Sequence, residues 1–299
     1  MYMSFHFLPP ATIVLTCSIA LVQTIPTITY AQTSPVLEAK HRVNIAGRQR
    51  MLSQRMSKAA CFIHSGVNVD AHMAMLKDAF DLFSTSHKVL VSGSNDTGLR
   101  AETSPAILEK LALVDQKWAS FAPYVQEVLS TSTIDGAQIA KMDAAGLALL
   151  KDMNGAVNTI ATEYGTLLED LPLIQSITID VAGRQRMLSQ KAAKEFCLIA
   201  SDIDAEQNSG KLAGTSHLFS TTLDALTTGM TGLVIAPPND ETSAMLEQVK
   251  AEWRVPSAIF DRTLNVAQPC CGHRQVIAEQ MELVLDYMNQ AVGMYETAQ

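Results

Sequence analysis

The sequence predicts an all-α protein made of two tandem up-down four-helix bundles related by a pseudo-twofold axis. Two observations lead to this expectation. The tract 43–54 recurs almost unchanged as 179–190, and the long stretches around both tracts have few breakers and carry apolar residues at helical spacing. No stretch alternates apolar and polar residues convincingly enough to predict a sheet.

The repeat is sharpest over nine identical residues, Ala-Gly-Arg-Gln-Arg-Met-Leu-Ser-Gln, which occupy 46–54 and again 182–190. Weaker correspondences follow at nearly the same spacing. They are Cys61 with Cys197, Trp118 with Trp253, and the pair Met153-Asn154 with Met288-Asn289. A whole domain is therefore duplicated. The two tryptophans and most of the methionines are expected to fill the core.

Each copy reads as four helices. In the first copy they are expected at about 38–64, 71–91, 105–129 and 136–168. The second copy repeats the series from about 173, with a longer first connection around 208–210 and a break at 237–238 before its third helix. Pro172 separates the copies, which gives domains of 38–170 and 171–299. Helices that run up, down, up and down leave the two motif helices parallel and facing each other, as in a homodimer.

The N-terminal 31 residues contain no Asp, Glu, Lys or Arg, and 11–22 is largely apolar. This pattern predicts a signal peptide (1–31) that is cleaved after Ala31 and a periplasmic protein, because the apolar run is shorter than the roughly 20 residues of a membrane span. The usual positive charges before the run are missing. An uncleaved segment that anchors the chain in the inner membrane is the alternative.

Composition restricts the partners. The chain is globular in character, with 47% hydrophobic residues, and its formal net charge is −8. Nucleic acids bind to basic surfaces, so a nucleic-acid partner is not expected. Any site for an anion must be local.

The duplicated tract offers such a site. On a helix, Gly47, Arg50, Gln54, Ser57 and Cys61 share one face at spacings of three and four. If this face meets its mate, the guanidinium groups of the two copies approach each other beside glycines that let the helices come close.

Arg50 and Arg186 would then repel each other unless a negative group lies between them. Their forked donors match the oxygens of a carboxylate, nitrate or phosphate, so a small oxyanion is the expected ligand. The alternative is that these arginines are solvated, or pair with carboxylates of the same chain in a structural or adaptor bundle without a small ligand.

The tract 44–55 resembles the signature of the periplasmic four-helix domain in nitrate/nitrite sensor kinases of the NarX type and type IV pilus chemoreceptors of the PilJ type. The resemblance implies that Gly47, Arg50, Gly183 and Arg186 belong to a ligand site at the helix interface. The sequence Gln-Arg-Met-Leu-Ser-Gln resembles the pilus receptors more than the nitrate sensors.

Two glutamines on the same face, Gln54 and Gln190, join the expected ligand site. The second copy departs from the first by having Asp180 for Asn44 and Lys191 for Arg55, which predicts an asymmetric and slightly less cationic site.

Four cysteines remain after signal removal: Cys61, Cys197, Cys270 and Cys271. In an exported protein they invite disulfides. Cys197 with Cys270 or Cys271 is feasible, as is Cys61 with Cys197, and the sequence does not choose. The run 270–273 lacks the spacing of a zinc or haem site, so no metal is expected.

These features favour an exported binding module that senses a small anion, nitrate or nitrite first. No catalytic constellation is recognisable and no cofactor is expected. No kinase or methyl-accepting segment follows the second copy, so the signal is expected to leave through an unidentified signalling or membrane partner.

Overall fold

The computed structural model describes residues 1–2, 34–167, 172–265 and 271–298. The predicted signal peptide and its cleavage point fall in 3–33, outside the described residues. Residues Thr33–Gln299 form one compact unit that contains both copies of the repeat.

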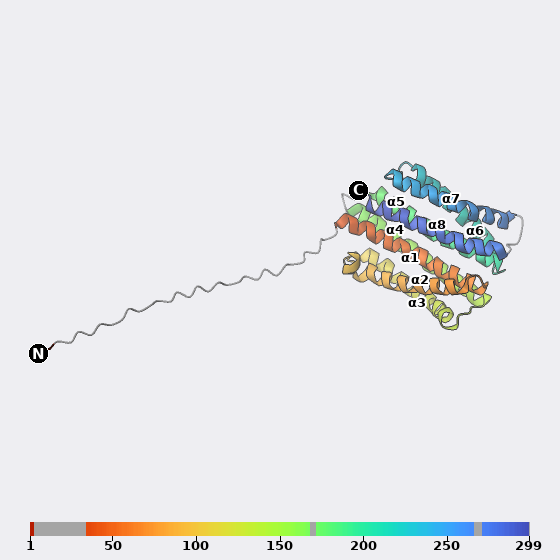
Figure 1. Cartoon of the computed structure of the whole chain (residues 1–299), viewed down its shortest axis with the longest axis horizontal. Coiled ribbons are helices and arrows are strands. Elements are labelled where there is room, and N and C mark those ends of the chain that lie inside the picture. The colour runs from red at the N-terminus through yellow and green to blue at the C-terminus, as the bar shows by residue number, and fades with distance from the viewer. Residues whose placement is uncertain (3–33, 168–171, 266–270, 299) are drawn as a thin grey trace. The chain divides into compact units, whose positions relative to one another are not determined.

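Eight α-helices make up the described part of that unit, four from each copy (Figure 1). The first copy has α1 (Pro35–His64), α2 (Val69–Ser92), α3 (Pro105–Thr131) and α4 (Gly136–Leu167), with a 3-10 turn η1 (Asn95–Thr97). The second copy has α5 (Leu173–Ala200), α6 (Ala205–Thr228), α7 (Asp240–Asn265) and α8 (Cys271–Thr297). The expected all-α fold is confirmed, and the helix bounds in the first copy lie within a few residues of those predicted.

Local sequence fixes the helix ends. The hydroxyl of Ser34 accepts a hydrogen bond from the backbone N–H of Leu37 at 3.2 Å, and the first helical residue is proline. Ser104 caps α3 in the same way. Gly93 directly follows the last residue of α2. Its φ is 72°, and an added Cβ would lie 2.5 Å from the backbone nitrogen of Ala101. Only glycine fits this turn.

The longer connection expected around 208–210 is wrong. These residues lie inside α6, and the link between α5 and α6 is 201–204, as short as the 65–68 link of the first copy. Asn208 is buried and its side-chain amide donates to the carbonyl of Ile203 at 2.9 Å. The imidazole of His72, at the matching place in copy one, bonds to the carbonyl of Val67. The composition of 208–210 indicates a loop, because it does not show that the Asn208 side chain can bond to a backbone carbonyl from inside a helix.

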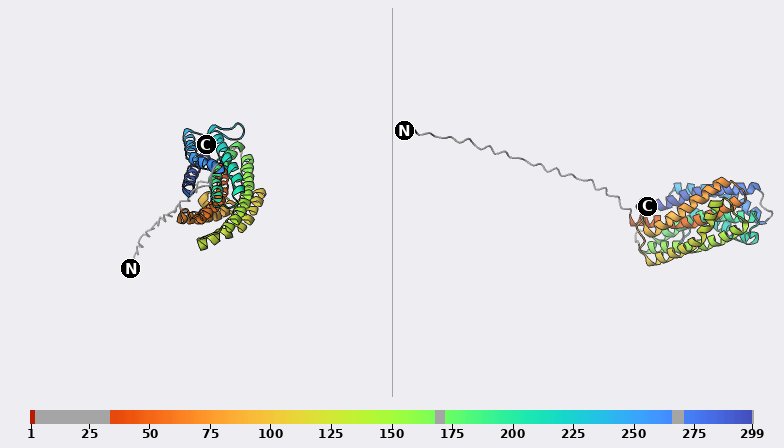
Figure 2. Two further views of the ribbon diagram at one scale, coloured as in Figure 1. Left: turned by 90° about the vertical axis from the view of Figure 1, so that its right-hand side faces the viewer. Right: turned by 90° about the horizontal axis from the view of Figure 1, so that it is seen from below.

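The most extensive contact between helices is that of α1 with α5. In the first copy α1 also packs on α2 and α4, and in the second α5 packs on α6 and α8. Figures 1 and 2 show the eight helices running along a common direction, with α1 and α5 central and the pairs α2/α3 and α6/α7 on opposite flanks. α1 and α5 are parallel, because matching residues of the two motifs meet at the same level.

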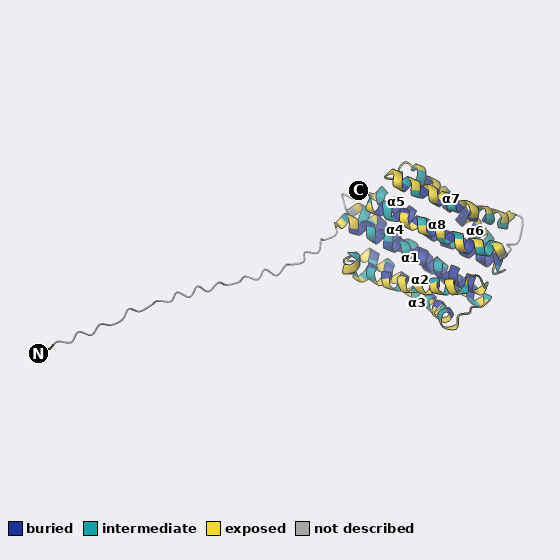
Figure 3. Cartoon of the chain, in the orientation of Figure 1, coloured by how far each residue is buried: buried dark blue, intermediate teal, exposed yellow. Residues whose placement is uncertain are grey.

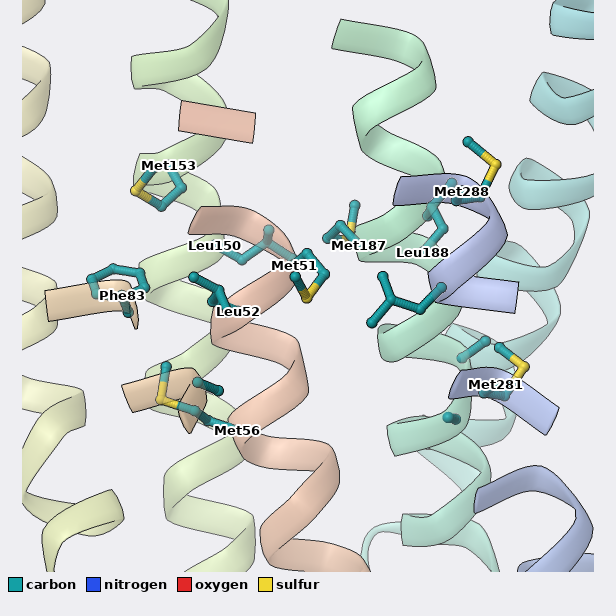
Figure 4. Close-up of a cluster of buried hydrophobic side chains, with 14 of the residues drawn as sticks. Met51, Leu52, Met56, Phe83, Leu150, Met153, Met187, Leu188, Met281 and Met288 are labelled. Atoms are coloured by element: carbon teal, nitrogen blue, oxygen red, sulfur yellow. The ribbon is translucent and has the colours of Figure 1, made fainter. Parts of the chain in front are cut away.

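Burial follows this arrangement. α1 is buried on most of its surface, whereas the outer helices expose one face to solvent (Figure 3). In Figure 4, Met51 and Met187 point toward one another from α1 and α5, and Met153 and Met288 lie within their own copies. The methionines thus fill the core as predicted.

The two tryptophans pack equivalently. Trp118 stacks on Phe83 with ring centroids 4.1 Å apart, and Trp253 stacks on Phe219 at 3.9 Å. The internal repeat therefore extends to the outer helices. Among the described residues, none of the helices has the length and apolar character needed to span a bilayer.

Candidate arginine site between the motif helices

Arg50 and Arg186 face each other at the contact of α1 with α5. Both are buried, with 0% and 3% of their surface exposed. A Cβ at Gly47 would lie 3.4 Å from Nη2 of Arg50 and 3.7 Å from Nη2 of Arg186. At Gly183 the corresponding distances are 4.0 Å and 3.2 Å. The two guanidinium groups therefore lie together over both glycines, whose missing side chains leave the space they occupy.

Each arginine reaches across to the other copy. Nη2 of Arg50 donates to Oδ1 of Asp180 at 2.5 Å, and the two form an ion pair. Nη2 of Arg186 donates to Oδ1 of Asn44 at 2.8 Å. Asn44 and Asp180 occupy the same place in the two motifs, so the two contacts are related by pseudo-twofold symmetry. The charges are not, because Asp180 is a carboxylate and Asn44 is a neutral amide.

An asparagine from its own copy also contacts each arginine. Nη1 of Arg50 lies 3.4 Å from Oδ1 of Asn154 on α4, and Nη1 of Arg186 lies 3.5 Å from Oδ1 of Asn289 on α8. Asn289 is exposed, which places one edge of the arginine pair close to the surface. The sequence predicts an asymmetric site from Asn44 and Asp180 but no role for Asn154 and Asn289, although their correspondence in the repeat is visible.

The two arginines differ in electrostatics. Burial, together with the positive charges of Arg48 and Arg50, lowers the pKa of Arg186 to about 9 against the attraction of Glu296 and Asp180. Burial also lowers the pKa of Arg50, but the Asp180 carboxylate opposes that shift. Within the described part of the chain, Arg186 forms no ion pair and is bonded to neutral amides and backbone carbonyls. The carboxylates of Glu296 and Asp180 attract its charge only from beyond ion-pair distance.

Gln54 and Gln190, the two glutamines expected in the ligand site, bond elsewhere. The amide oxygen of Gln54 accepts from Nζ of Lys194 at 2.9 Å, and that of Gln190 accepts from Nη1 of Arg55 at 3.2 Å. Both are buried one helical turn beyond the arginines. The structure therefore brings together Gly47, Arg50, Gly183 and Arg186, whereas neither glutamine bonds to Arg50 or Arg186.

A second charged layer lies at this level. Lys58 forms an ion pair with Glu282 of α8, and Lys194 forms one with Asp143 of α4. Both lysines are buried, and each pair joins one copy to the other. Burial lowers the pKa of Lys58 to about 8 against the attraction of Glu282, and the cations Lys58 and Arg55 hold the pKa of Glu282 at about 2 despite its burial.

A disulfide closes the interface beyond the lysines. Cys61 of α1 is bonded to Cys197 of α5, with Cα atoms 6.2 Å apart. This is one of the pairings that the sequence left open. Cys270 and the side chain of Cys271 lie outside the described residues. Among the residues described, no cluster of three or more metal-ligating side chains occurs.

The family assignment rests on the duplicated sequence. A family model described as the N-terminal region of type IV pili methyl-accepting chemotaxis transducers, PilJ, matches residues 33–142 and again residues 175–268. The chain belongs to the PilJ family. Each PilJ match begins beside a motif helix and covers at least three helices of its copy, which agrees with two tandem copies.

PilJ domains are the N-terminal sensor domains of signal transducers, so the chain is a signalling sensor module. A comparison with curated proteins finds no match to the chain.

Proposed function

We propose that the chain is an exported sensor module that binds one small monoanion, nitrate or nitrite first, between Arg50 and Arg186. The observation that carries this proposal is the buried guanidinium of Arg186. It lies beside a second guanidinium and is bonded only to neutral groups in the described residues. A buried cation without a counter-charge costs free energy, and a bound oxyanion relieves that cost with charge-assisted hydrogen bonds.

The charges favour a monoanion. Asp180 pairs with Arg50 and also with Arg184, so Arg186 is the one of the two facing arginines that has no carboxylate partner in the described residues. A divalent anion would bring a surplus negative charge next to the Asp180 carboxylate. Planar nitrate and bent nitrite have the size and oxygen geometry that a guanidinium fork binds. The exposed Asn289 beside Arg186 offers such an ion a short route from solvent.

Occupancy can alter the surrounding contacts through Asn44. Its amide oxygen accepts from Arg186, while its amide nitrogen donates to the Glu296 carboxylate of α8. An anion that takes Nη2 of Arg186 displaces Asn44 and changes the link from α1 to α8. The end of α8 is then the place where a partner protein reads the state of the site. The predicted export, by a cleaved signal peptide or with an uncleaved inner-membrane anchor, places this exchange in the periplasm.

Titration calorimetry with sodium nitrate and sodium nitrite tests the proposal. Wild type is expected to bind one ion per chain, and Arg186→Met, which keeps the length and apolar stem of the side chain, is expected to lose binding. Arg50→Ala combined with Arg186→Ala should also lose it. Arg254→Ala, on the exposed face of α7, serves as the matched control and should bind as wild type does. Circular dichroism melting shows that each variant is folded.

The second candidate is a structural or adaptor bundle without a small ligand. The ion pair of Arg50 with Asp180 favours it, because an internal carboxylate satisfies one arginine. Equal heats for wild type and Arg186→Met would support this alternative and contradict anion sensing.

A further inference from the structure

The loop 229–239 between α6 and α7 has a close counterpart in the first copy. Each of the two loops follows a glycine with positive φ, Gly93 in one and Gly229 in the other. Each contains a single antiparallel bridge, Ser94 with Leu99 and Met230 with Val234. The two copies thus build related loops at the same place in the fold, although the second turn is one residue shorter, and the chemistry of the two loops can be compared.

The chemistry of the two loops is opposite. Asp96, Arg100 and Glu102 give the first loop both signs of charge. Residues 225–239 contain no charged residue and no histidine. The second loop instead exposes three large apolar side chains, Met230 at 43%, Leu233 at 55% and Ile235 at 40%. Three such side chains gathered on one short loop indicate a contact surface and not a chance exposure.

The hollow beneath each loop has diverged in the same direction. In the first copy it has a volume of about 550 Å³ and is lined by charged groups that include Glu38, Arg42 and Arg100. In the second copy it has about 290 Å³ and is lined mostly by apolar groups, among them Ile179, Ile235, Ala236, Pro238 and Tyr295. The apolar surface therefore continues from the loop into the body of the second copy.

The same end of the bundle carries further apolar side chains. α1 and α5 both begin there, beside the end of α8 and the α6–α7 loop (Figure 1). Leu37 is 41% exposed and Leu173 is 38% exposed. The chain enters this end at Ser34, and the 33 residues before it contain no Asp, Glu, Lys or Arg. The exposed apolar side chains of the loop, Leu37 and Leu173 are thus gathered at the end of the molecule where α1 and α5 begin.

We propose that the 229–239 loop is a lipid-contact surface, with Met230, Leu233 and Ile235 inserted into the interfacial region of a bilayer. The nearest charged residues along the chain, Asp224 and Asp240, flank 225–239 and do not lie within it, so the three side chains can enter lipid without burying a charge. Insertion of an uncharged loop into lipid costs no ion desolvation and gains the burial of its apolar side chains. The proposal does not depend on anion binding.

Tryptophan fluorescence of the full chain tests the contact at the loop itself. Leu233→Trp places a reporter at the most exposed apolar position of the loop. Asp96→Trp places one on the matching loop of copy one and is the control. Each is titrated with vesicles of phosphatidylethanolamine and phosphatidylglycerol, and with the same vesicles carrying brominated acyl chains. The signal of wild type, which contains Trp118 and Trp253, is subtracted.

The expected result is a blue shift and bromine quenching for Leu233→Trp, and neither for Asp96→Trp. Changing Leu233 and Ile235 together to serine should weaken insertion of the loop by roughly tenfold. The measurement uses Met230→Trp as the reporter, with and without the two serines, and compares the vesicle concentrations that give half of the quenching. Because the reporter lies on the loop, an anchor elsewhere in the chain does not produce the signal.

Equal quenching of both reporters, or of neither, would overturn the proposal. A blue shift of Leu233→Trp that needs no vesicles and grows with protein concentration would also overturn it, since the loop would then contact a second copy of the chain.

Discussion

Replacing Asp180 by the residue of the first copy should turn the half-neutralised arginine site into a symmetric one. Asp180 is 7% exposed, and its Oδ1 lies 2.5 Å from Nη2 of Arg50. In Asp180→Asn the amide oxygen can still accept from Arg50, but the negative charge is gone. A carboxylate about 6 Å from a bound monoanion repels it by about 3 kcal/mol at an effective dielectric constant of about 20. Its removal should therefore tighten nitrate binding roughly a hundredfold.

The same change should destabilise the anion-free protein. A buried cation that loses its carboxylate partner costs about 3 kcal/mol, and Arg50 would be that cation. Nitrate at about a hundred times its Kd should restore about 2.7 kcal/mol, because it binds only the folded state. Asp180→Asn is thus expected to melt below wild type without nitrate and to recover most of the difference with it.

Asn44→Asp is the matched control, since it places a second carboxylate on Arg186 at the related position. It should abolish nitrate binding, because the new carboxylate pairs with Arg186 and takes the place of the anion. Its stability gain is offset because the amide that donates to Glu296 is lost. The assay is calorimetry with nitrate on the two variants and wild type, combined with thermal melting with and without nitrate. Nitrate affinity that is unchanged or weaker in Asp180→Asn would refute the reasoning, as would undiminished binding in Asn44→Asp.

Three further outcomes are expected. Nitrate affinity in wild type should be constant below pH 9 and should fall about tenfold per pH unit above it in calorimetry, because the pKa of Arg186 is about 9 and the ion binds the protonated guanidinium. Glu282→Gln should lower the free energy of unfolding by about 3 kcal/mol in urea titrations, since buried Lys58 loses its carboxylate. Replacing Cys61 and Cys197 together by alanine should lower it by about 2–5 kcal/mol, because the bond closes a long loop in the unfolded chain; a melting temperature equal to that of wild type would contradict this.

The fold could be predicted from the sequence because the domain is duplicated within the chain. The tract 46–54 and its copy 182–190 fix the register of the two bundles, and helical periodicity supplies the remaining elements. The connection expected at 208–210 is wrong because Asn208 lies inside α6 and bonds from there to the carbonyl of Ile203 in the preceding link. Such a role depends on where the Ile203 carbonyl points and cannot be read from residue types alone.

The site was accessible only in part. Face periodicity and the family resemblance placed Gly47, Arg50 and their mates together. The partners of the arginines required the crossing geometry of α1 and α5. Asn44 and Asp180 were noted as a departure between the copies, but only the structure shows that each bonds to the arginine of the other copy.

Spacing along a helix also failed to separate the glutamines from the arginines. Gln54 lies on the face of Arg50, yet one turn of helix brings it to the level of the buried lysines. Lys194 then takes its amide oxygen. Whether Gln54 bonds to an arginine or to a lysine depends on which side chain of α5 is long enough to reach it. That depends on how α1 packs against α5, which the sequence does not show.

Electron density at the pseudo-twofold axis tests the central claim most directly. Crystals grown with nitrate and diffracting to high resolution should show a planar, three-lobed density within about 3 Å of Nη2 of both Arg50 and Arg186. In those crystals the Asn44 amide should have turned away from Arg186. An Arg186 guanidinium still bonded to Asn44 and Asn289, with no density beside it, would contradict the claim that an anion belongs between the two motif helices.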